Sequence, residues 1–324
     1  MMTWLLLAIQ DLPEGNAGIA SKFVGDAGIE GHPAVVFSDN FETGRCKAEN
    51  SWGGVGFSKQ RENVNGGTTS MELALVRPSP KPEQGLGFQH SFKDGFDTLF
   101  LRYYAKFAKD MELFHGGSHD GGSIFARAPG VPDAKPGIPA DGKNEYTALL
   151  DTWRPDEQVA SPGNIAIYCY HPEQRHQYGE HFFPSGKMLP FGRPVGTYFG
   201  PTFVPRPEYV PERGRWTCYE LMVKANAPGK RDGRIAIWVD GKIAADFPNL
   251  RLRDVDTLKA NRISIGLYTQ NSKVTKTCTM WFDDVVAATS YIGPIGTGRA
   301  AAKEKPLQPT PGGKSASPFS KDFK

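Results

Sequence analysis

Apolar and polar residues alternate along much of the chain, in short segments separated by turns. In segment 98–107, Leu99 and Leu101 fall on one face and Arg102 and Tyr104 on the other. Because successive side chains of a β-strand point to opposite faces, this period of two predicts a strand with two chemically different sides. We expect one side to be buried and the other to face a polar groove.

The same alternation recurs in five further segments, namely 164–170, 216–224, 234–240, 261–270 and 277–288. The pair Asp240-Gly241 between two apolar runs is typical of a tight hairpin turn. Amphipathic segments long enough for connecting helices are missing between the strands, which argues against a βαβ chain. The sequence therefore predicts an all-β fold, a sandwich of two antiparallel sheets.

Three regions differ in composition. Residues 1–34 carry few periodic apolar positions and predict an extended leader. Residues 35–293 hold all the predicted strands and form one domain. Residues 294–324 are rich in Lys, Pro, Gly and Ser, without an apolar pattern, and predict a disordered tail.

Composition and charge exclude several classes of protein. The net charge of +3 is too small for the basic stripe of a nucleic-acid binder, although it suits an acidic glycan as partner. The apolar run 4–9 is too short to span a membrane, and it is compatible with the remnant of a signal peptide. We therefore expect a secreted protein. Its four cysteines allow either two disulfides or buried thiols; they are Cys46, Cys169, Cys218 and Cys278.

Segment 216–253 contains the pattern W-x-x-Y-E-L-x-V-K-x-N-x-P-G-K-x-D-G-x-I-x-I-W-V-D-G-K. It resembles a hairpin of the alginate and glucuronan lyases of polysaccharide lyase family 14. Segments 101–107, 146–154 and 167–172 resemble further strands of that family. The resemblance implies a concanavalin-A-like β-jelly roll that acts on polysaccharides.

The resemblance also implies site residues. The Tyr-x-Tyr pair of the family is matched by Tyr168 and Tyr170. The lysine of its Gly-Gly-Lys loop is matched by Ser118, and its Ser-x-Arg pair by Thr147 and Leu149. This sequence thus keeps the two tyrosines and replaces the two cations.

An eliminating lyase needs a base, an acid and a group that neutralises the uronate carboxylate. Tyr168 and Tyr170 lie two residues apart, so their hydroxyls share one face of a strand and are candidates for base and acid. His119 follows a Gly-Gly-Ser turn and is a candidate to assist. The alternatives are tyrosines that pack across a sheet and a histidine in an adaptable exposed loop.

Eight further residues carry charge, a hydroxyl or an imidazole near the predicted strands and are candidates for substrate binding. They are Arg102, Tyr104, Lys106, His115, Arg154, His171, Glu220 and Lys224. Arg102 or Arg154 would face the carboxylate of a uronate. A solvated outer face is the alternative explanation for these charges.

Asp39 and Asp283 lie on the first and last predicted strands, which are neighbours in jelly rolls. Oxygen-rich clusters of this kind bind structural Ca²⁺, and turn chemistry is the alternative. The predicted chemistry requires no other cofactor.

Three functions remain open from the sequence. The first is a β-elimination lyase for uronate-containing glycans. The second is a glycan-binding or extracellular matrix protein without catalysis, which the loss of the lysine and arginine favours. The third and weakest is a glycoside hydrolase, because the paired glutamates of retaining jelly-roll glycosidases are missing.

Overall fold

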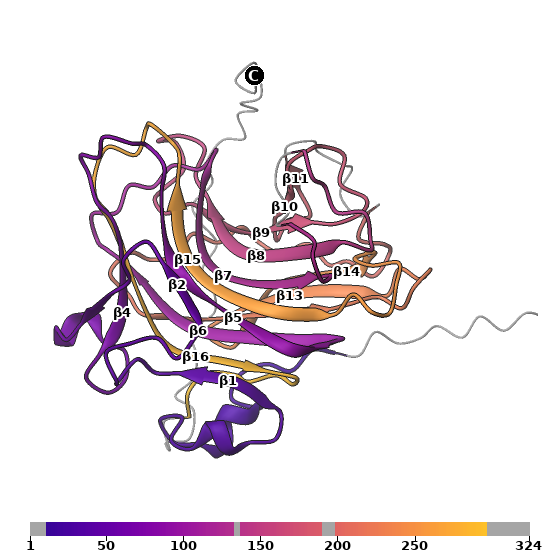
Figure 1. Ribbon diagram of the computed structural model, residues 1–324, viewed down its shortest axis with the longest axis horizontal. Helices are drawn as coiled ribbons and strands as arrows, with labels where there is room; N and C mark the ends of the chain where they lie inside the picture. The colour runs from indigo at the N-terminus through magenta and orange to yellow at the C-terminus, as the bar shows by residue number, and fades with distance from the viewer. Residues whose placement is uncertain (1–10, 133–136, 190–197, 297–324) are drawn as a thin grey trace, which may run out of the picture.

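The computed structural model describes residues 11–132, 137–189 and 198–296 of the chain. Two antiparallel sheets of eight strands stack face to face, as the sequence predicts (Figure 1). We call them the inner and the outer sheet. The strands bend in one direction, and β6 and β16 of the outer sheet lie outside the bend of β15 and β7 (Figure 1).

The inner sheet runs in the order β11 (Met188–Leu189), β10 (Glu180–Phe182), β9 (Asn164–Tyr170), β8 (Glu145–Trp153), β7 (Ser118–Arg127), β15 (Ala260–Thr269), β5 (Gln84–Phe96) and β2 (Asn50–Trp52). The outer sheet runs in the order β14 (Lys242–Leu250), β13 (Gly233–Val239), β12 (Thr217–Lys224), β6 (Thr98–Phe107), β16 (Cys278–Ala288), β4 (Ser70–Leu75) and β3 (Gly56–Ser58), with β1 (Val35–Asp39) paired to β16.

The predicted strands match observed ones closely. Segment 98–107 is strand β6, and Asn164–Tyr170 is strand β9, with the predicted bounds. Asp240 and Gly241 both have positive φ angles, of 49° and 77°, which is the geometry of a type I′ turn. The hairpin from β13 to β14 thus forms as its sequence predicts.

The core lies between the sheets and is built from alternate positions of their strands. On β8 and β9, Ala148, Leu150, Ile165 and Ile167 point into it. The residues between them point to the other side of the inner sheet. We call that side the open face. This alternation places the polar and aromatic positions of five strands on one surface.

Residues 11–34 do not form an extended leader. Two short 3₁₀ helices, η1 (Ile19–Lys22) and η2 (Ile29–Gly31), pack against the outer sheet. They bury Ile19 and Ile29 against a second apolar cluster that includes Trp238. A third 3₁₀ turn, η3 (Arg61–Asn63), precedes β4. The predicted tail falls mostly in residues 297–324, outside the described residues.

Other segments of the chain cover the outer sheet, and its polar side chains bind to them. Arg102 is fully buried on β6, and one of its guanidinium nitrogens is hydrogen-bonded to the carboxylate of Asp26. Lys106 donates to the backbone carbonyl of Glu62 and to Asn63. The second face of β6 therefore meets other parts of the chain, where the sequence predicts a groove.

The structure also bears on disulfide bonds and on membrane-spanning segments. All four cysteines are free thiols, three of them buried. Within the described residues, no helix is long and apolar enough to cross a membrane.

We predict that Asp26→Asn lowers the free energy of unfolding by about 3 kcal/mol, because it leaves Arg102 as an uncompensated buried charge. Asparagine retains the size of Asp26 and tolerates its positive φ angle of 59°. The double variant Asp26→Asn with Arg102→Met should recover most of that loss in urea unfolding. Equal losses in the single and double variants would contradict the role of the pair.

Candidate active site

The open face of the inner sheet brings together the three predicted catalytic residues. His119 lies on β7, and Tyr168 and Tyr170 lie on β9, with β8 between them. The rings of His119 and Tyr168 are stacked, with centroids 4.7 Å apart. On the other side of His119, the ring of Tyr268 is stacked at 6.2 Å. The imidazole is thus held between two phenol rings.

Asp151 on β8 is the polar centre of this arrangement, and it is fully buried. Its Oδ2 lies 2.8 Å from His119 Nδ1, and its Oδ1 accepts the backbone N–H groups of Asp120 and Thr152. Burial opposes its charge, but the approach of three histidines outweighs burial and holds the pKa of Asp151 well below its ordinary value. Asp151 is therefore an ionised carboxylate inside the sheet.

The ionised Asp151 fixes the tautomer of His119. A carboxylate can only accept hydrogen bonds, so His119 Nδ1 carries the proton that it donates to Oδ2. In the neutral form of the ring, Nε2 then holds a lone pair. The side chain of His119 is 31% exposed, whereas that of Asp151 is fully buried. This geometry suits a general base that works at the surface of the open face.

The two tyrosines are suited to donate a proton, whereas His119 is suited to accept one. Their hydroxyl oxygens lie 3.3 Å apart, and the backbone N–H of Gly179 donates to Tyr168. Burial raises the pKa of Tyr168 and, to a smaller extent, that of Tyr170. Both hydroxyls therefore keep their protons, which fits an acid and not a base.

His181 on β10 completes the aromatic cluster. Its ring lies 4.6 Å from Tyr168 and 4.3 Å from Trp153, and its Nε2 lies 3.9 Å from Asp151. Burial lowers the pKa of His181 to about 4, although Asp151 acts in the opposite direction. His181 is therefore neutral at physiological pH.

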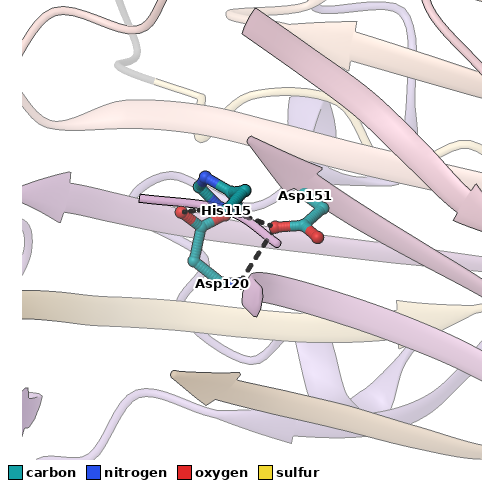
Figure 2. Close-up of side chains that lie close together, drawn as sticks. All are labelled: His115, Asp120 and Asp151. Carbon is teal, nitrogen blue, oxygen red and sulfur yellow. Dashed lines mark hydrogen bonds and ion pairs between the residues drawn. The ribbon is translucent and has the colours of Figure 1, made fainter. Parts of the chain in front are cut away.

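A buried group below this surface has the composition of a metal site. It consists of His115, Asp120 and Asp151 (Figure 2). His115 Nε2 lies 3.5 Å from an oxygen of Asp151 and 3.8 Å from one of Asp120. However, His115 Nδ1 accepts the backbone N–H of Arg154, so Nε2 must carry the proton of the neutral ring. A cation at Nε2 would move the ring proton to Nδ1, against the N–H of Arg154, and the residues therefore do not fit a metal ion.

Asp120 shows where a further proton resides. Oγ1 of Thr152 lies 2.7 Å from Asp120 Oδ2 and 3.0 Å from the carbonyl oxygen of Pro162. The Thr152 hydroxyl donates its hydrogen to Oδ2, and the backbone N–H of Thr152 donates to Oδ1 of the same carboxyl group. Burial and the neighbouring Asp151 raise the pKa of Asp120 well above its ordinary value. Asp120 is thus a neutral acid beside an ionised one.

The structure separates the other predicted residues from this site. Five of them lie on β6 and β12 of the outer sheet: Arg102, Tyr104, Lys106, Glu220 and Lys224. Glu220 accepts two backbone N–H groups from residues 292 and 293, and Tyr104 accepts one from residue 295. Except for the exposed Lys224, these residues are buried or half-buried. Arg102, Tyr104 and Glu220 bind the leader and the C-terminal part of the domain, and Lys106 binds the η3 turn.

Three predicted residues near the inner sheet are also structural. Arg154 pairs with Glu112 and lies over the ring of Phe114. His171 is buried between Glu180 and Tyr198, at 3.0 Å from each. His115 is buried in the cluster of Figure 2 and does not reach the surface. None of the three replaces the missing neutraliser.

The carboxylates predicted to bind calcium accept hydrogen bonds from backbone N–H groups. Asp39 accepts the N–H groups of Phe41 and Lys47, and Asp283 accepts that of Asn65. Neither belongs to the ligand group found among the described residues. Calcium at this position stays a prediction.

Sequence reasoning missed Asp151 and Tyr268. Asp151 does carry a signal, because it interrupts the apolar run of strand 145–153 at an alternate position. Charged residues are almost never fully buried unless they are paired. Its partner His119 is 32 residues away, so the pairing itself is not visible in the sequence.

Comparison with known proteins supports the fold. No family model and no curated sequence matches the chain. Solved structures do match. The PL-14 alginate lyase from Aplysia kurodai has a TM-score of 0.53 at 13% identity, covering 79% of this chain and 99% of that one. Alginate lyase Aly36B has a TM-score of 0.51 at 19% identity, covering 80% and 98%.

The endo-β-1,4-glucuronan lyase from the fungus Trichoderma reesei has a TM-score of 0.51 at 14% identity, covering 79% of this chain and 96% of that one. The predicted jelly roll of the alginate and glucuronan lyases is thus confirmed. Identities this low establish the fold alone, so the function must be argued from the site.

We predict that Asp151→Asn reverses the tautomer of His119. The two backbone N–H groups keep the amide oxygen at the Oδ1 position, so the amide N–H₂ faces His119 Nδ1 and forces it to accept. Nitrogen-15 NMR of the imidazoles should show Nδ1–H in the wild type and Nε2–H in the variant. His115, whose tautomer is set by a backbone N–H, is the internal control. An unchanged His119 would contradict the assignment.

We predict that His181 makes the protein less stable in weak acid. The folded pKa of about 4 lies below the ordinary 6.5, so the unfolded chain binds a proton first as the pH falls. The stabilisation is complete above pH 6.5 and decreases by about 3 kcal/mol as the pH falls to 4. Urea unfolding of His181→Phe should show a weaker decline over that window, and an equal decline would refute the burial of a neutral histidine.

Proposed function

We propose that this protein is a polysaccharide lyase that cleaves uronate-containing glycans by β-elimination, outside the cell. The observation that carries the proposal is the placement of His119, whose Nδ1 faces Asp151, whose Nε2 is left for a substrate, and whose ring is stacked on Tyr168 of the open face. The jelly roll that it shares with alginate and glucuronan lyases supports it. A related structure is that of an Aly36B variant in complex with an alginate trisaccharide.

His119 Nε2 acts as the base and Tyr168 as the acid. The base removes the proton from the carbon next to the carboxylate, and those electrons form the new carbon–carbon double bond. The glycosidic carbon–oxygen bond breaks, and the leaving oxygen takes the hydroxyl proton of Tyr168. Before the substrate binds, Tyr168 donates this hydrogen to the hydroxyl of Tyr170, 3.3 Å away, and the leaving oxygen then replaces Tyr170 as its acceptor.

The neutraliser of the uronate carboxylate must come from residues other than the predicted arginines. Gln270 lies two residues beyond Tyr268, its side-chain oxygen accepts the Tyr268 hydroxyl at 3.3 Å, and it is exposed. Its amide N–H₂ donors remain for a substrate. Amide donors can stabilise the charge that develops on a carboxylate during proton abstraction. We assign that role to Gln270.

A glycan-binding protein without catalysis is the second candidate. One observation favours it: Arg102, Lys106 and Arg154 are all engaged away from the open face. A hydrolase is less well supported, because Asp120 and Asp151 are buried together. They cannot flank a glycosidic bond from opposite sides.

The test is incubation with alginate and with glucuronan while the ultraviolet absorbance of the unsaturated product is followed. We expect absorbance from the wild type and a loss of about 100-fold or more in rate for His119→Ala and Tyr168→Phe. Tyr209→Phe, at a half-buried tyrosine outside the site, is the matched control and should retain the rate. Binding without absorbance would indicate the second candidate, and new reducing ends without absorbance would indicate hydrolysis.

A further inference from the structure

An exposed tryptophan extends the open face beyond the candidate active site. Trp52 ends the edge strand β2, which pairs with β5, and it is 39% exposed. A single exposed apolar residue needs no explanation, whereas one that is continuous with other rings forms a patch of the kind that marks binding sites. In Figure 1, β2 lies beside β5 and β15, on the side of the inner sheet away from β8 and β9.

The indole of Trp52 lies over the open face, not beyond its edge. A Cβ atom added to Gly87 would be 2.9 Å from Trp52 Cζ2, and one added to Gly266 would be 3.4 Å away. Gly266 precedes Tyr268 by two residues, so such a Cβ points to the same side as the Tyr268 ring. The ring of Trp52 therefore covers backbone that carries no side chains.

Trp52 is continuous with the aromatic residues of the site. Gly85 is the residue opposite Tyr268, and a Cβ there would be 3.0 Å from the Tyr268 ring and 3.7 Å from Trp52 Nε1. Tyr268 is in turn opposite His119. Rings from β2, β15, β7 and β9 thus follow one another across the strands. Three strand spacings separate β2 from β7, which is about 14 Å.

We propose that Trp52 is a stacking subsite for a sugar ring of the same uronan chain that is cleaved at His119. The C–H groups on one face of a pyranose are apolar and match the exposed face of the indole, while the hydroxyls and carboxylate at the rim remain in water. The glycan then lies across the strands from β9 towards β2. This inference rests on the proposed function and adds to it a second contact, several sugars away from the reacting bond.

The test compares short and long substrates in a background that cannot cleave them. His119→Ala is combined with Trp52→Ala, and the binding of alginate and glucuronan disaccharides and hexasaccharides is measured by calorimetry. We expect Trp52→Ala to weaken hexasaccharide binding about tenfold, which corresponds to one aromatic contact. Disaccharide binding should not change, because a disaccharide at His119 does not reach Trp52.

Two control variants define the effect. Trp52→Phe retains an aromatic face and should recover most of the hexasaccharide affinity. Trp281→Phe alters a tryptophan on β16 of the outer sheet and should change the binding affinity for neither oligosaccharide. Equal hexasaccharide affinity with and without Trp52 would overturn the subsite and leave the lyase proposal intact. If neither the wild type nor His119→Ala binds any of these oligosaccharides, the proposed function fails and the subsite fails with it.

Discussion

The site depends on one buried negative charge, the carboxylate of Asp151. A charge without solvent is costly unless it is paired and hydrogen-bonded. Two backbone N–H groups and His119 satisfy it directly, and the rings of His115 and His181 approach within 4 Å. The orientation of His119 follows from this pairing. The catalytic proposal is therefore a consequence of how the sheet accommodates a charge in its interior.

A second carboxylate beside the first sets a further constraint. Two adjacent buried carboxylates cannot both ionise, because their repulsion is strong where the dielectric constant is low. Asp120 resolves the conflict by keeping its proton, because burial and the neighbouring Asp151 raise its pKa well above the ordinary value. His115 presents its own N–H to the same pair. The group resembles a metal site in composition, and its protons occupy the positions that a cation would need.

The sequence predicts the fold well and the site in part. Alternation alone locates β6 and β9, and it places Tyr168 and Tyr170 on one face. It fails on the second face of β6, because a polar side that meets solvent and a polar side covered by another segment have the same period. Arg102 is paired with Asp26, 76 residues away, and no local pattern reports such a pairing. The contact between His119 and Asp151 was invisible for the same reason.

The shared fold also explains how the chemistry can differ from that of its structural relatives. A curved sheet presents every second residue of its strands on the open face, whatever those residues are. Leu149, at the position predicted for an arginine, lies directly opposite Tyr168, and Ser118 is buried against Thr269. Two residues beyond Leu149, on the same face of β8, Asp151 holds His119 beside that tyrosine. The scaffold and the tyrosine are retained. In the proposed function, a histidine oriented by a buried carboxylate is the base, and the amide of Gln270 takes the place of the missing cations.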